Sequence, residues 1–360
     1  MAGSAHPAAP GCEYAVIVVT DALAHAAAVL VGAACILGFF RSIIIAVFLQ
    51  RSRNDAVARL SAAITGAVFD AVLPRDVPQP RVDRALVWFW PVAQFGMIYT
   101  WYALVIIGFA AVNWGTGASP NAVQALIASG SSLSTLGFAT PSNLQGEVIA
   151  IVEAGIGLFL VVFLLTFIPG YLAVQQTRAD RVARVYARAG TPPIGVALVA
   201  WYCRAGQREA LDGLCAEWES WVRDLGVTHS RSPGLAVTRS YRPAENWVSA
   251  VMALLDAAAI AKDVTDDPSP TATVLLVAAE QSLGDLAAAL RAAPGSAPPP
   301  SRSAFDAACR ELEAAGARLK PDRDAAWLAF RASQDRYADL MVGLAARIRI
   351  SPETWRLTGR

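Results

Sequence analysis

The chain has 360 residues, a formal net charge of +1 and a hydrophobic fraction of 55%. Its mean hydropathy of +0.42 is high for a soluble domain and low for a pure membrane bundle, which favours a membrane part joined to a soluble part. The balanced charge predicts no nucleic-acid partner. Neither the five cysteines nor the three histidines have the spacing of a disulfide framework or a metal centre.

Three long apolar runs are expected to cross a bilayer as helices. They cover about 15–49, 85–113 and 146–173, and each exceeds the roughly 20 residues that a span requires. The first run overshoots this length, so the Arg41 side chain is expected to extend to the headgroups. The fold class that follows is an all-α membrane protein with three transmembrane helices.

The distribution of arginine predicts the orientation of these spans. Arginines are concentrated in the 50–84 loop and in 178–188, whereas the residues before the first run and the stretch 112–147 contain no Lys or Arg. The positive-inside rule then places the N-terminus outside and the C-terminal half in the cytoplasm of a cell-membrane, multi-pass protein.

The 50–84 loop contains DAVARLSAAITGAVFDAVL, whose apolar residues have near-helical spacing. We expect an amphipathic helix on the inner membrane surface, with packing against the cytoplasmic domain as the alternative. The domain organisation is then an N-terminal segment with the first span, a cytoplasmic loop, a pore domain and a helical cytoplasmic domain, at residues 1–50, 51–84, 85–175 and 176–360.

The C-terminal half has the pattern of a soluble, helical domain. Apolar residues follow one helix face in 207–225 and in 245–262, and further helices are expected in 271–291 and 303–348. Residues 292–303 are predicted to be a linker, and residues 235–243 an irregular connector. No motif in this half defines a regulator, and no glycine fingerprint of a dinucleotide-binding domain is present.

A short segment between the second and third runs is too polar and too short to cross a bilayer. It has a helix-start signal at Ser119-Pro120, a helix expected over 120–132, and an extended stretch over 135–138. Irregular backbone at membrane depth requires burial in protein or contact with water. A re-entrant pore loop on the outer side is the simplest arrangement that meets this requirement.

A cation loses its shell of water when it enters a selective pore. Successive backbone carbonyls can replace that water. Gly137 supplies a position where the backbone can be left-handed, and Thr135 adds a hydroxyl at the inner mouth. Leu136 and Phe138 are expected to point away from the axis and to pack against surrounding helices. The carbonyl end of the 120–132 helix would face the cavity below and favour a cation.

The order of outer helix, pore helix, TLGFATP and inner helix resembles the pore domain of tetrameric potassium channels, in particular two-span bacterial channels and inward rectifiers. Thr135, Leu136, Gly137 and Phe138 match the start of that family's TVGYGD filter, and Glu153 matches a glutamate found behind it. The resemblance covers about 85–175. It implies a homotetramer in the lipid bilayer that conducts a monovalent cation, K⁺, passively, with no enzymatic activity, no cofactor and no metal besides the permeant ion.

Two filter positions differ from that family. Ala139 and Thr140 stand where it has glycine and aspartate, and alanine resists a left-handed conformation by about 1 kcal/mol. The expected filter is therefore residues 135–139, with support from Ser134, Thr140 and Glu153.

Glu153 is expected to bond the filter backbone or a neighbouring pore helix, with an outer-interface position as the alternative. In the third run, Gly155 and Gly157 could form a hinge or a close helix contact. Pro169 and Gly170 could bend the helix or end it.

Two other functions are compatible with the sequence. A membrane-anchored signalling or scaffold protein would bind a partner through its cytoplasmic helices, and it would tolerate changes at Thr135 and Gly137. An ion-transporter subunit built from repeated span–loop–span units would have four such units in one chain, whereas this chain has one.

Overall fold

The computed structural model describes residues 10–48, 55–73, 77–141, 143–231, 233–239, 242 and 245–350. Within these ranges the protein is helical and has no strand, with one isolated bridge between Thr265 and Leu319. Four of the described helices, α1, α4, α6 and α11, contain stretches long and apolar enough to cross a membrane. The expected all-α class is confirmed, and the composition of these helices is that of a membrane-associated protein.

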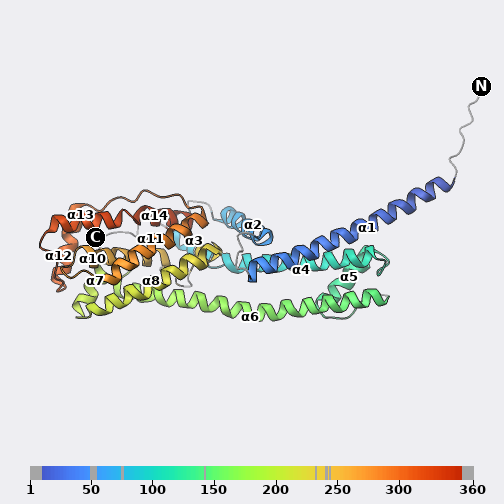
Figure 1. Cartoon of the computed structure of the whole chain (residues 1–360), viewed down its shortest axis with the longest axis horizontal. Coiled ribbons are helices and arrows are strands. Elements are labelled where there is room, and N and C mark those ends of the chain that lie inside the picture. Colours follow the sequence, from blue (N-terminus) through green and yellow to red (C-terminus); the bar gives the residue numbers. More distant parts are fainter. Residues whose placement is uncertain are drawn as a thin grey trace, which may run out of the picture. The chain divides into compact units, whose positions relative to one another are not determined.

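The elements follow one another along the chain as Figure 1 labels them. Their bounds are α1 Pro10–Ile43, the π-helical turn η1 Ile44–Phe48, α2 Ala56–Val72, α3 Gln79–Leu86, α4 Phe89–Gly115, α5 Ala122–Leu133, α6 Leu144–Ala189, α7 Gly195–Arg204, α8 Arg208–Arg231, α9 Pro233–Val237, α10 Trp247–Asp263, α11 Pro270–Leu290, α12 Arg302–Ala314, α13 Arg323–Gln334 and α14 Ala338–Arg347.

The chain divides into two compact units. The first contains α1, the first turn of α2, most of α4, α5 and the part of α6 up to Tyr171. Glycines allow α1 and α4 to pack closely, since a β-carbon at Gly32 would lie 2.5 Å from the Gly108 carbonyl oxygen. Its core contains Phe39, Ile43, Met97, Trp101, Val105, Phe109, Leu133 and Leu160.

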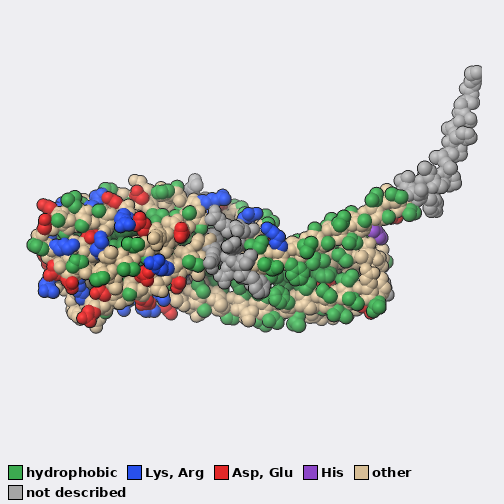
Figure 2. Space-filling view, viewed as in Figure 1, with side chains coloured by type: hydrophobic (Ala, Val, Ile, Leu, Met, Phe, Trp, Pro, Cys, Tyr) green, Lys and Arg blue, Asp and Glu red, His purple; other side chains and the backbone are tan. Residues whose placement is uncertain are grey.

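The outer surface of this unit is apolar. Large hydrophobic side chains on all three long helices are exposed, among them Leu37 on α1, Phe95 on α4 and Leu165 on α6. Figure 2 shows hydrophobic side chains over these helices, whereas Lys, Arg, Asp and Glu are gathered over the C-terminal helices. This distribution suits a unit whose surroundings are lipid.

The second unit contains the remainder of α2, α3, the first turn of α4, the last part of α6 and α7–α14. Its core is continuous, and α10 lies at its centre with nearly every residue buried. The apolar helix α11 packs against α8 and α10, and Leu275, Leu283 and Leu286 are fully buried there. The hydropathy of α11 is therefore explained by a position inside this helical core.

Several boundaries differ from the expectations. The third apolar run continues without interruption as α6 to Ala189, and residues 303–348 form three helices, α12–α14. The expected linker at 292–303 has no regular structure before α12, yet it is held: the Gly295 amide donates to the Asp339 carbonyl at 2.8 Å. The expected connector at 235–243 contains the end of α9. Residues 240, 241, 243 and 244 lie outside the described residues.

The buried side chain of Arg178 connects α6 with the segment at α9 in the second unit. Arg178, near the end of α6, donates to the carbonyls of Leu235 and Thr238 at 2.8 and 2.9 Å. Its guanidinium lies 3.4 Å from Nε2 of His229, and burial together with this charge lowers the pKa of that histidine to about 3. Arg178 therefore contacts protein.

Candidate functional site

The short helix α5 lies between α4 and α6 (Figure 1). It begins after Asn121, whose side chain accepts a 2.8 Å hydrogen bond from the Gln124 amide. This cap places the first helical residue two positions after the predicted Ser119-Pro120 signal. With 12 residues the helix extends about 18 Å, well short of a bilayer core of about 30 Å.

The C-terminal end of α5 is closed by the loop that follows it. The Ser134 amide donates to the Gly130 carbonyl at 3.1 Å, and the Thr135 amide donates to the Ser132 carbonyl at 3.0 Å. The Ser134 hydroxyl also donates to the Gly130 carbonyl at 2.5 Å. The Gly130 and Ser132 carbonyls are thus satisfied locally.

A single serine organises the loop. The Leu136 and Gly137 amides donate to the Ser131 carbonyl at 3.0 and 3.4 Å, and the Ala139 amide donates to the Ser131 hydroxyl at 3.1 Å. Because the peptide unit is planar and trans, each carbonyl points opposite to the amide that follows it. The carbonyls of residues 135, 136 and 138 are therefore directed away from α5.

Two residues of this loop have left-handed backbone. Gly137 has a φ of 71°, as predicted, and Thr135 has a φ of 57°, which was not predicted. A left-handed, β-branched residue is a genuine outlier, and such strain is often held at functional sites. Ala139 is not among the described residues with positive φ, so the cost expected at that position does not arise.

The side chains of the predicted filter are exposed within one chain. Leu136 is 70% exposed and Phe138 is 69% exposed, so neither is covered by helices of its own chain. Thr135 and Thr140 are exposed as well. The loop thus presents its carbonyls, its hydroxyls and two large apolar side chains to surroundings outside the chain.

Glu153 on α6 is fully buried, so its carboxylate does not extend to the surface of the chain. Its Oε1 makes a short hydrogen bond with the hydroxyl of Ser129 on α5, and that hydroxyl lies 2.9 Å from the Ile106 carbonyl on α4. Its Oε2 has no hydrogen-bond partner among the residues that the structure describes. The partner of Glu153 is thus a serine of α5 in the same chain, in place of the expected filter backbone or neighbouring chain.

This cluster gives a testable expectation. Glu153→Ala is expected to destabilise the chain by about 1–3 kcal/mol, because the Ser129 hydroxyl loses one of its two partners and the removed side chain leaves a cavity inside the packed unit. Glu153→Gln should lose less stability, because the glutamine amide preserves the size of the side chain and one hydrogen bond. Thermal unfolding of the two variants in detergent measures the difference, and equal losses would contradict the pairing.

The four candidate hinge residues differ in their surroundings. A β-carbon at Gly157 would overlap the carbonyl oxygen of Leu133, whereas Gly155 and Gly170 have open space around them. Gly157 is therefore a close-contact residue between α6 and the end of α5. The helix continues through Pro169, which lies inside α6 and does not end it.

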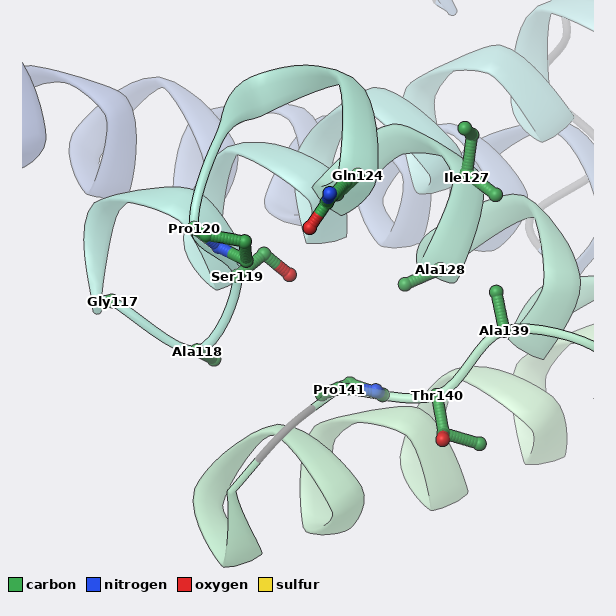
Figure 3. A pocket seen from close by; sticks show the side chains of 10 residues that line it. All are labelled: Gly117, Ala118, Ser119, Pro120, Gln124, Ile127, Ala128, Ala139, Thr140 and Pro141. Carbon is green, nitrogen blue, oxygen red and sulfur yellow. The ribbon is translucent and has the colours of Figure 1, made fainter.

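A cavity of about 360 Å³ lies beside the loop. The connection before α5, one side of α5 and residues 139–141 line it, and Figure 3 shows Gln124, Ala139 and Thr140 around this space. Its lining contains no charged side chain. Among the described residues no group of three or more His, Cys, Asp or Glu is placed to hold a metal ion.

Two residues of the site were missed in the sequence. Ser129 and Ser131 are fully buried and hold Glu153 and the loop, respectively. The available signal was the accumulation of serines at 129, 131, 132 and 134 in an otherwise apolar helix. Serine is a poor choice for a helix interior unless its hydroxyl has a specific partner.

No family model, no curated protein and no solved structure matches this chain.

Proposed function

We propose that the chain is one subunit of a homotetrameric channel that conducts monovalent cations, with K⁺ as the permeant ion. The observation that carries the proposal is the direction of the loop backbone. Three amides of residues 136–139 are bound by Ser131, and the opposing carbonyls point away from α5. Carbonyl oxygens grouped in this way are the ligands that replace the hydration shell of K⁺.

One loop cannot surround an ion, so closed rotational symmetry must supply the other ligands. A ring of four chains would bring the carbonyls of residues 135, 136 and 138 to one axis. Neighbouring chains would also cover Leu136 and Phe138, which are 70% and 69% exposed in a single chain.

The proposed topology uses three of the four apolar helices. In it α1, α4 and α6 cross the bilayer, α5 with its loop enters from the outer side, and α11 stays in the cytoplasmic core. The 46 residues of α6 extend about 69 Å, more than twice the bilayer core. Its arginine-rich last part therefore belongs to the second unit. In the same topology the N-terminus of the chain lies outside.

Replacing Gly137 by alanine is the direct test of this loop. The left-handed conformation at residue 137 costs alanine about 1–2 kcal/mol more than glycine, so the carbonyl directions are disturbed while the chain still folds. We expect K⁺ efflux from loaded proteoliposomes to fall at least about tenfold.

Gly130→Ala is the matched control, because Gly130 is helical and has open space around it. Its efflux should equal that of the unmodified chain. Vesicles with the unmodified chain that hold their K⁺ gradient as well as empty vesicles would contradict a channel. A scaffold protein would instead keep its partner binding in the Gly137→Ala variant.

A further inference from the structure

Helix α2 exposes an apolar face that carries no charge. Leu60, Ile64, Val68 and Val72 are 56%, 57%, 52% and 69% exposed, and the smaller residues of that face are exposed alanines. The only charged residues of α2 are Arg59 and Asp70. At 100° per residue both lie more than about 100° around the helix from Ile64.

The remaining sides of α2 are already occupied. Ser61 is buried against α4, where a β-carbon at Gly96 would lie 2.8 Å from its hydroxyl. Towards the other end, Leu73 and Phe69 pack in a cluster with Val82 and Leu86 of α3. The exposed face is therefore not the face through which α2 joins the protein.

The start of α2 is fixed to the end of an apolar helix. The Asp55 carboxylate accepts from the Ala58 amide and from the Ser42 hydroxyl, both at 2.8 Å. Ser42 in turn accepts from the indole nitrogen of Trp101 at 2.8 Å. Ser42 directly follows Arg41, the first Lys or Arg of the chain, and a first arginine after an apolar run marks the membrane–water boundary.

We infer that α2 lies in the lipid interface, with Leu60, Ile64 and Val68 against the acyl-chain boundary. The apolar face of α2 is continuous and has four large exposed residues. The first turn of α2 is bound to α1 at the membrane–water boundary, so lipid is the nearest apolar medium for this face. Arg59 would lie among the headgroups. The inference depends on α1 crossing the membrane and does not depend on ion conduction.

The test places a photoreactive benzoylphenylalanine at residue 64, and in separate variants at 68 and at 70, of the full chain. The probe is a vesicle of phosphatidylcholine and phosphatidylglycerol, and mass spectrometry identifies the adducts after irradiation. We expect lipid adducts at 64 and 68 at least tenfold above those at 70, since Asp70 lies on a different side of the helix and is exposed.

The other outcomes overturn the inference. Adducts between two chains at residue 64 would identify α2 as a contact between copies, and adducts within one chain would show that protein covers this face. Absence of adducts at 64 and 68 alike would place the face in water. Comparable circular dichroism of all three variants shows that each is folded.

Discussion

Replacing Gly157 by alanine is expected to destabilise the chain by about 3 kcal/mol, the upper end of the usual range for overpacking. The added methyl would overlap the carbonyl oxygen of Leu133, a backbone atom that cannot rotate away. Either α6 or the end of α5 must move, and overpacking of this kind is costly. Thermal unfolding of the full chain in detergent should show a midpoint several degrees lower.

Gly155→Ala is the control for this effect. It lies on the same helix two residues earlier, where an added methyl group would meet no neighbouring atom, and alanine favours a helix by about 1 kcal/mol over glycine. Its midpoint should be unchanged or higher. Equal destabilisation of both variants would show that any substitution in this part of α6 is harmful, and would remove the case for a specific contact with α5.

Replacing Arg239 by methionine is expected to cost about 3–5 kcal/mol, the range for breaking a buried ion pair. Its side chain is almost fully buried and donates to Asp83 at 2.8 Å and to the carbonyls of Ile348 and Arg349 at 2.6 and 2.9 Å. Removing the guanidinium leaves the Asp83 carboxylate buried without this partner. Thermal unfolding and limited proteolysis of the second unit would both report the loss.

A nearby exposed arginine provides the comparison. Arg242 pairs with Glu245 at 3.1 Å, and its side chain is about half exposed. Exposed pairs of this kind contribute about 0–1 kcal/mol, so Arg242→Ala should leave the unfolding midpoint nearly unchanged. A small effect of Arg239→Met, within the range of Arg242→Ala, would contradict the role of the buried arginine in holding α3 and the end of α14.

The long helices could be predicted from the sequence because their signal is local. A run of apolar residues predicts α1, α4 and α6 whatever surrounds it, and the composition of 120–132 predicts α5 to within two residues. The end of the third apolar run is not the end of the helix. Hydropathy falls after residue 173, but arginine and alanine continue the helix to Ala189.

The conformation of the loop was only partly predictable. Glycine at 137 signals a left-handed position by itself. Threonine at 135 gives no such signal, since its conformation is imposed by amides that turn back to Ser131 and Ser132. These hydrogen bonds depend on how the loop leaves α5, and no residue pattern in the loop specifies them.

The partners of buried polar groups could likewise not be predicted from the sequence. Glu153 is recognisable as an unusual acid in an apolar run, but its pairing with Ser129 arises from the packing of α5 against α6. Arg178 lies in an arginine-rich segment and Arg239 in an expected connector, and neither position shows a signal of burial in the sequence. Only the folded second unit shows that both are buried and bound to backbone carbonyls.

The number of chains in the assembly tests the central claim most directly. Native mass spectrometry of the full chain released from detergent micelles measures it without a functional assay. A pore formed by carbonyls from several loops predicts a complex of four times the 38.0 kDa chain mass. A particle of one chain that persists when the detergent is exchanged for lipid nanodiscs would contradict it.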